Sequence, residues 1–154
     1  MTTEKKVLVL GASGLLGSHV FKELKVRNFQ VSGTFNKNRT SSDLVHLDLR
    51  TISNYDLKKL VLQYDYVINA HGLIKQKIEN WNIGSIHDAF YLNSIVNRKI
   101  VRFLMGSETK MISVGTDCVF SGKSGFYDEN SKKDAKDIQQ IFNRRLYIIR
   151  FKNE

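Results

Sequence analysis

The amino-acid sequence predicts an α/β fold, a doubly wound parallel β-sheet in three α/β/α layers, formed by a single domain over residues 1–154. Two observations support this expectation. Short apolar segments, typical of strands buried on both faces, alternate along the chain with segments whose apolar residues recur at helical spacing. A glycine-rich turn also separates the first apolar segment from the first amphipathic one. Such alternation is typical of a parallel sheet with helices on both faces, where ligands bind at the carboxyl ends of the strands.

The first strand and the first helix have the clearest patterns. Lys6–Leu10 is apolar from its second residue onward, which predicts a buried strand. Beyond the glycines, Leu16, Val20, Phe21 and Leu24 recur on one helical face, so a helix follows. Further strands are expected at Phe29–Phe35, Leu44–Leu47, Tyr66–Ala70 and Met111–Val114, helices at Ile52–Leu62 (capped by Ser53 or Asn54) and Ile86–Leu104, and a last helix and strand at Asp134–Phe142 and Arg145–Phe151.

The composition indicates a protein that folds in water. With 154 residues, 42% of them hydrophobic and 25% charged, the chain is near the averages of globular domains and can bury roughly 70% of its unfolded surface. No apolar run approaches the roughly 18 residues of a membrane-spanning helix, and Met1–Lys6 is polar where a signal peptide turns apolar. We therefore expect a cytoplasmic protein without a membrane partner. The single cysteine, Cys118, has no disulfide partner and no nearby zinc ligand, so no metal is expected.

The net charge of +9 raises the question of nucleic-acid binding, because clustered cations gain affinity by releasing counterions from phosphates. The cations are instead spread over the chain in separate pairs, without a basic stripe interleaved with aromatic residues. These pairs are Lys5-Lys6, Lys58-Lys59, Arg98-Lys99, Lys132-Lys133 and Arg144-Arg145. We expect no nucleic-acid partner, although a positive field attracts smaller polyanions such as a dinucleotide or a nucleotide sugar.

The strongest functional motif is the glycine pattern Gly11-x-x-Gly14-x-x-Gly17 between the first strand and the first helix. In such a turn Gly11 allows the strand to turn sharply, Gly14 allows the backbone to approach a pyrophosphate, and Gly17 allows the helix to pack closely on the sheet. The free amides and the positive dipole end of the helix then attract the phosphates. The motif predicts dinucleotide binding in a Rossmann-like fold, with a tight turn that binds nothing as the alternative.

Three later segments carry a resemblance to a known family. They are Val67–Gly72 (VINAHG), Thr116–Gly122 (TDCVFSG) and Gly125–Glu129 (GFYDE), of which the last two are the most specific. Together with Val7–Gly17 they resemble the extended short-chain dehydrogenase/reductase family, and within it the dTDP-4-dehydrorhamnose reductases. The resemblance covers most of the chain. It implies an NAD(P)-dependent reductase of a 4-keto nucleotide sugar in surface polysaccharide biosynthesis.

The same resemblance implies a set of cofactor-binding residues. The segment after the second strand, Phe35–Arg39, has no carboxylate for the ribose of NAD, whereas Lys37 or Arg39 can meet a 2′-phosphate, so NADP(H) is favoured over NAD(H). An ordinary solvated loop is the alternative there. Asp48 matches the family position that reads the adenine edge, or is a plain helix-entry aspartate, and Asn93 is the family's helix asparagine or a solvated one. The full expected set is Gly11, Ser13, Gly14, Leu15, Leu16, Gly17, Asn36, Lys37, Arg39, Asp48, Leu49, Ala70, His71, Gly72 and Asn93.

For the substrate, the resemblance places Thr116 beside the reacting carbonyl, as a hydrogen-bond donor that polarises the oxygen, with a plain strand-end hydroxyl as the alternative. Gly115 stands where family members usually carry a supporting serine. Val119, Phe120 and Tyr127 are the expected substrate-binding residues, Tyr127 in the segment that resembles the family's substrate flap.

The proton-donating pair of the family is not found in its expected place. Family members use a tyrosine whose pKa is lowered by a lysine four residues later. Only Tyr55 with Lys59 has that spacing here, and this pair lies before the fourth strand. The family's carboxy-terminal substrate domain is also not included in residues 1–154. Two hypotheses follow: a nucleotide-sugar reductase with impaired or no catalysis, or a non-catalytic dinucleotide-binding subunit of a homo- or hetero-oligomer.

Overall fold

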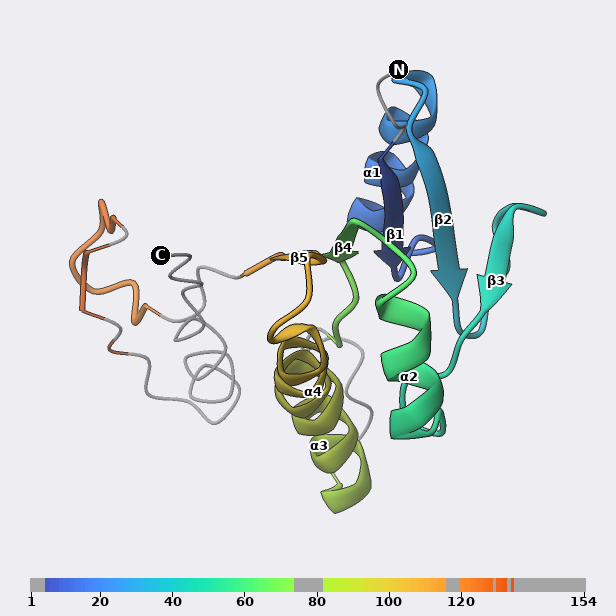
Figure 1. Cartoon of the computed structure of the whole chain (residues 1–154). Helices are drawn as coiled ribbons and strands as arrows, with labels where there is room; N and C mark the ends of the chain where they lie inside the picture. Colours follow the sequence, from blue (N-terminus) through green and yellow to red (C-terminus); the bar gives the residue numbers. More distant parts are fainter. Residues whose placement is uncertain (1–4, 74–81, 116–119, 129, 133, 135–154) are drawn as a thin grey trace.

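The computed structural model describes residues 5–73, 82–115, 120–128, 130–132 and 134 of the chain. Across these ranges five parallel strands form one sheet in the order β3-β2-β1-β4-β5 (Figure 1). The strands are β1 (Lys6–Leu10), β2 (Gln30–Phe35), β3 (Leu44–His46), β4 (Tyr66–Asn69) and β5 (Lys110–Ser113). The chain winds outward from β1 to β3, then crosses back to continue on the other side of β1. This is the predicted doubly wound sheet, and the α/β fold class is confirmed.

Helices cover both faces of the sheet, because successive residues of β1 point to opposite sides. On one face Val7 and Val9 form a core cluster with Phe21 of α1 (Leu15–Val26). On the other face Leu8 and Leu10 belong to a larger cluster. On that second face α2 (Asn54–Val61), the π-helix η3 (Tyr91–Ile95) and α4 (Val96–Leu104) supply Leu57, Val61, Leu92, Val96, Ile100 and Leu104 to the cluster. The helix α3 (Ile83–Phe90) leads directly into η3.

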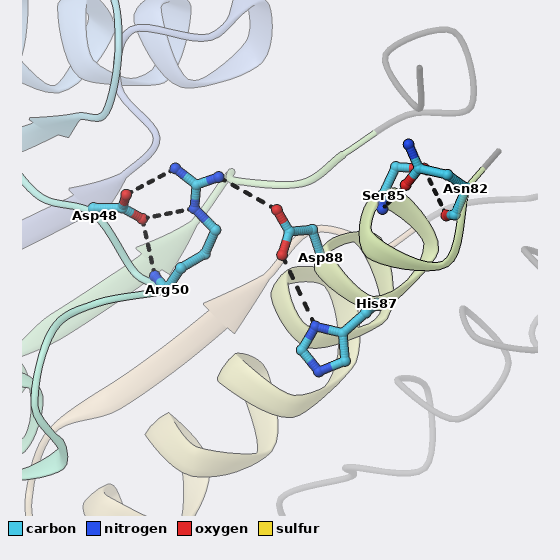
Figure 2. Close-up of polar contacts among 6 residues, drawn as sticks. All are labelled: Asp48, Arg50, Asn82, Ser85, His87 and Asp88. Atoms are coloured by element: carbon cyan, nitrogen blue, oxygen red, sulfur yellow. Dashed lines mark hydrogen bonds and ion pairs between the residues drawn. The ribbon is translucent and has the colours of Figure 1, made fainter. Parts of the chain in front are cut away.

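Side-chain caps explain where two of the helices begin. The Oγ of Ser53 accepts a hydrogen bond from the backbone N–H of Asp56 at 3.0 Å, so Ser53 rather than Asn54 caps α2. Asn82 caps α3 in the same way through the N–H of Ser85 at 2.8 Å (Figure 2). Because of this cap the third helix begins at Ile83. The apolar periodicity had predicted a later start, at Ile86.

The fifth strand has a more open environment than the others. Ile112 keeps 52% of its surface exposed, and Val114, just beyond the strand, keeps 46%. The predicted last helix and last strand lie outside the described residues, apart from Asp134. In the part of the chain that the structure describes, no helix is long and apolar enough to cross a membrane.

Candidate dinucleotide-binding site

The glycine loop forms a tight turn between β1 and α1. Gly11 has a φ of +77°, in the left-handed region, and its N–H donates to the Oγ1 of the buried Thr34 at 3.1 Å. The N–H of Gly14 donates to the carbonyl of Gly11 at 3.0 Å, which closes the turn. Gly14 is also the N-cap residue of α1. No side chain caps this helix, whereas side chains cap α2 and α3. The first amides of α1 are therefore available to an anion.

Two of the glycines are required by close contacts. A Cβ on Gly17 would lie 2.2 Å from the carbonyl oxygen of Gly11, so any side chain there would push α1 away from the loop. A Cβ on Gly11 would lie 2.9 Å from the Cα and Cβ of His71. Gly14 is different, because its backbone has φ −77° and its Cβ would meet only the Gly11 oxygen, at 3.2 Å. These close contacts explain why the chain has glycine at Gly11 and Gly17.

The residues expected to choose the cofactor follow β2 and are exposed. Lys37 and Arg39 both lie at the surface. The Arg39 guanidinium bonds the backbone carbonyls of Ser41 and Ser42 and lies 6.0 Å from the centre of the Phe35 ring. These contacts hold Arg39 against the end of β2.

Asp48, after β3, belongs to an ion-pair network centred on Arg50 (Figure 2). Its carboxylate accepts bonds from the backbone N–H and the Nε of Arg50, both at 3.0 Å, and forms an ion pair with Nη2 at 2.8 Å. The side-chain bonds from Arg50 lower the pKa of Asp48 to about 2. Nη1 of Arg50 reaches Asp88 of α3 at 3.3 Å. The carboxylate of Asp48 is therefore ionised and already paired, which matches a structural role, and the adenine-reading role stays a prediction.

A chain of buried amides lies behind the end of β4. Asn69 donates through Nδ2 to the Oδ1 of Asn97, and Asn97 donates through Nδ2 to the carbonyl of Asn93 at 3.1 Å. The Oδ1 of Asn69 accepts the backbone N–H of His71 at 3.2 Å and lies 3.1 Å from the Nδ1 of its ring. The side-chain amide of Asn93 forms two hydrogen bonds of 2.8 Å with the backbone of Leu73. Its Oδ1 accepts from the Leu73 N–H, and its Nδ2 donates to the Leu73 carbonyl. Asn93 is thus buried and engaged, not a solvated helix residue.

Asn93 and Asn97 are four residues apart on one helical segment, so both side chains lie on the same face of it. Residues Tyr91–Ile95 form a π-helix inside an otherwise α-helical segment, and such turns are frequent at functional sites. Sequence reasoning missed Arg50, Asn69 and Asn97 as members of the site region. A polar residue inside an apolar strand, as Asn69 is, was the signal that could have pointed to them.

The structure brings His71 against Gly11 of the glycine loop, and of the predicted substrate residues it describes only Phe120 and Tyr127. Thr116 and Val119 lie outside the described residues. Phe120 and Tyr127 stack on each other at 4.5 Å between ring centres, in a loop that Figure 1 shows apart from the glycine loop. The hydroxyl of Tyr127 accepts the N–H of Ser124 at 3.0 Å and lies 3.4 Å from the Oγ of Ser121, and these bonds lower its pKa.

Two other places on the molecule offer less chemistry. A hollow of about 480 Å³ lies at the amino-terminal side of the sheet and is lined by Lys6, Gln30, Val31, Ser32, Gln63 and Tyr64. It is open and lies at the end of β1 opposite the glycine loop, away from the edge where doubly wound sheets bind a dinucleotide. Among the described residues no group of three or more His, Cys, Asp or Glu side chains is arranged to hold a metal ion.

A family model for the NAD dependent epimerase/dehydratase family matches residues 7–142. The chain belongs to this family. The match begins in β1 and includes the glycine loop, so the family assignment covers the geometry described above. No curated protein sequence matches the chain closely enough to count as a relative.

Solved structures show the same fold at low sequence identity. A hypothetical dTDP-4-dehydrorhamnose reductase from Sulfolobus tokodaii is 23% identical with a TM-score of 0.79 over 93% of this chain. UDP-glucuronic acid 4-epimerase from Bacillus cereus, solved with a UDP-sugar and NAD, is 20% identical with a TM-score of 0.75 over 93%. A short-chain dehydrogenase/reductase superfamily protein from Agrobacterium tumefaciens with bound NAD is 14% identical with a TM-score of 0.76 over 93%. The chain spans 50%, 50% and 43% of these three proteins, respectively.

Proposed function

We propose that the chain binds NAD(P) as a reductase-like protein related to dTDP-4-dehydrorhamnose reductases, with impaired or no catalysis in residues 1–154. Its place would be nucleotide-sugar metabolism for surface polysaccharide biosynthesis, with a nucleotide sugar as substrate if the chain is active. The observation that carries the proposal is the glycine loop. Glycine at Gly11 and Gly14 and the start of α1 without a side-chain cap leave room and hydrogen-bond donors for a pyrophosphate.

NADP(H) is the proposed cofactor. Lys37 and Arg39 follow β2 at the surface, and no carboxylate stands between Phe35 and Arg39 to hold the ribose 2′-hydroxyl of NAD. The Ser41 and Ser42 carbonyls hold the Arg39 guanidinium near the end of β2. A pre-positioned guanidinium suits the bidentate binding of a phosphate.

Among the residues that the structure describes, the tyrosine and lysine contacts favour weak or absent chemistry. Tyr55, which has Lys59 at the family spacing, lies in α2 with 74% of its surface exposed. A second pair, Tyr91 with Lys99, is joined by a 2.9 Å hydrogen bond, but the Tyr91 ring packs against the core beneath the helices. Neither pair lies on an element that follows β5, where the family resemblance places the proton donor. A non-catalytic dinucleotide-binding regulatory or interaction module, within a homo- or hetero-oligomer, is therefore the second candidate function.

Calorimetric titration with NADPH and NADH tests the proposal. The wild-type chain should bind NADPH saturably, and Gly14→Val should weaken binding at least about tenfold because its side chain occupies the space before α1. The φ of −77° at Gly14 is open to any residue, so the variant should fold. Gly84→Val is the matched control, because it also places a branched side chain at the start of a helix, α3.

Two further results separate the finer points of the proposal. Lys37→Ala and Arg39→Ala should weaken NADPH binding more than NADH binding, and an equal loss would contradict the 2′-phosphate role. Consumption of NADPH with dTDP-4-dehydrorhamnose would favour the reductase, whereas cofactor binding without turnover would favour the binding module. A well-folded wild-type chain that binds neither cofactor would refute both.

A further inference from the structure

The strand β2 carries polar side chains on one face, although it lies inside the sheet. In its register with β1, Gln30 stands beside Lys6, and Ser32 points to the same side two residues later. That side is the face of the larger core cluster, because the neighbour of Ser32 is Leu8. Inner strands of a parallel sheet are usually apolar on both faces. As far as the structure describes the larger cluster, no side chain of β2 belongs to it, whereas Val31 packs against the smaller one.

The hollow of about 480 Å³ at the amino-terminal side of the sheet is bordered by this polar face. Gln30 and Ser32 line it together with Lys6, Gln63 and Tyr64. Small-molecule sites usually have about 300–1,000 Å³, so the hollow is large enough for a small ligand. The polar residues of β2 thus face a space instead of a core.

Backbone contacts fix two walls of the hollow. The N–H of Lys6 donates to the carboxylate of Asp65 at 2.8 Å, and the N–H of Asp65 donates to the Lys6 carbonyl at 2.9 Å. Tyr64 packs against the larger core cluster, and its carbonyl accepts from the Oγ1 of Thr109 at 2.8 Å. These walls are held before a ligand enters, which lowers the cost of binding.

Positive charge gathers at the edge of the sheet where the hollow opens. The strands begin at this edge and the helices that connect them end there, so the sheet brings together cations that are distant in sequence. Lys5, Lys25 and Arg27 form ion pairs, whereas no ion pair within the described ranges involves Lys6, Lys58, Lys59 or Lys110. The exposed Glu108 offsets part of this charge. The remaining positive field attracts anions.

Neutral hydrogen-bonding groups complete the lining. The Nε2 of Gln63 donates to the carbonyl of Lys59 at 3.0 Å, so its Oε1 remains to accept from a ligand hydroxyl. Ser32 adds a hydroxyl and Gln30 an amide, and neither side chain has a hydrogen bond to another described residue. Groups that both donate and accept match the hydroxyl groups of a sugar.

We propose that the hollow binds a monosaccharide that carries one phosphate group. The phosphate pairs with the ammonium of Lys6, the one charged side chain among the described residues that line the hollow. The amides of Gln30 and Gln63 and the hydroxyl of Ser32 bind the sugar. Because the hollow lies at the end of β1 opposite the glycine loop, it is separate from the proposed dinucleotide site, and both can be filled at once.

Calorimetric titration with glucose 6-phosphate tests the proposal, with glucose and inorganic phosphate as the two partial ligands. The wild-type chain should bind glucose 6-phosphate at least about tenfold more tightly than either of them. Lys6→Met keeps the aliphatic stem and the backbone bonds to Asp65, and it should weaken this binding at least about fivefold. Lys22→Met is the matched control, because it removes the same charge from an exposed position of α1 outside the hollow. It should change the affinity less than about twofold.

A second variant tests the space itself. Ser32→Leu places a large apolar side chain in the hollow, so it should abolish the binding of glucose 6-phosphate while the circular-dichroism spectrum stays unchanged. In NMR spectra of the wild-type chain, the backbone amide signals of Lys6, Ser32 and Gln63 should shift with glucose 6-phosphate. The same shifts should appear with NADPH present.

Four results would overturn the proposal. Equal losses in Lys6→Met and Lys22→Met would show a general effect of net charge, and inorganic phosphate bound as tightly as glucose 6-phosphate would exclude recognition of the sugar. Displacement of glucose 6-phosphate by NADPH would place it at the glycine loop. A folded wild-type chain without saturable binding of glucose 6-phosphate would leave the hollow without this ligand, and the dinucleotide proposal would stand independently.

Discussion

At the scale of single residues, a comparison of two glycines distinguishes the stability cost of a left-handed backbone from that of a close contact. Gly11 and Gly106 both have a φ of +77°. A Cβ on Gly11 would lie 2.9 Å from His71, whereas a Cβ on Gly106 would have nothing within 4 Å. The two positions therefore impose the same conformation and differ only in what surrounds it.

We expect Gly106→Ala to lower the free energy of unfolding by about 1 kcal/mol, the usual cost of a left-handed non-glycine residue. Gly11→Ala should cost about 1–3 kcal/mol more, because the added methyl group also collides with His71. Urea unfolding followed by circular dichroism measures both. Equal losses would show that His71 yields without cost and that the contact is not tight.

At the scale of elements, the Asp48–Arg50–Asp88 network connects the end of β3 to α3. Asp48 is mostly buried, with 18% of its side chain exposed, and Arg50 is 35% exposed. Arg50 contacts both carboxylates, so the connection depends on the charge of Asp48. Since the folded-state pKa of Asp48 is lowered from 3.8 to about 2, its contribution to stability is complete above about pH 4 and is lost as the pH falls through about 2.

Asp48→Asn should therefore lower the free energy of unfolding by about 1–2 kcal/mol at pH 7. The difference from the wild-type chain should shrink between pH 4 and pH 2, as the wild-type carboxylate is protonated. Denaturant titrations at a series of pH values measure this. Asp43→Asn is the control, because Asp43 pairs with Lys25 at a side chain that is 51% exposed, and exposed pairs contribute little. A constant difference across the pH range would exclude the charge as the cause.

The elements themselves were largely predictable, because their patterns are local. The apolar runs of β1 and β4 predicted the sheet, and the glycine spacing predicted the edge at which a ligand is expected. The contacts that complete the site region were not predictable, because they join distant residues: Arg50 meets Asp88 across 38 positions, and Asn69 meets Asn97 across 28. The π-helical turn Tyr91–Ile95 has no simple periodicity in sequence. The roles predicted for Thr116 and Val119 stay predictions, since both residues lie outside the described ranges.

At the scale of the whole molecule, the two faces of the sheet differ in how much core they hold. Ile100 of α4 is fully buried in the larger cluster, on the face covered by α2, η3 and α4. Ile112 of β5 is half-exposed. The same residue type is thus buried in the helix that packs on the sheet and half-exposed in the sheet itself. The larger of the two described core clusters, and with it most of the stabilising burial, lies on the face with Ile100.

Ile100→Ala should lower the free energy of unfolding by about 2–5 kcal/mol, through lost burial and the cavity left behind. Ile112→Ala should cost less than about 1 kcal/mol, because roughly half of its side chain is already in water. Thermal unfolding by calorimetry compares the two. A large loss in Ile112→Ala would show that β5 is covered in solution.

The two hydrogen bonds between Asn93 and Leu73 fix the chain where it leaves the sheet. A peptide unit in a sheet is satisfied when a neighbouring strand offers one acceptor and one donor to it. The side-chain amide of Asn93 offers both groups to Leu73 from a helix. It therefore satisfies the backbone of Leu73 as a neighbouring strand would, although Leu73 lies beyond the last residue of β4. In this way the turn η3 fixes the segment that leaves β4 at the edge of the sheet where the ligand is expected to bind.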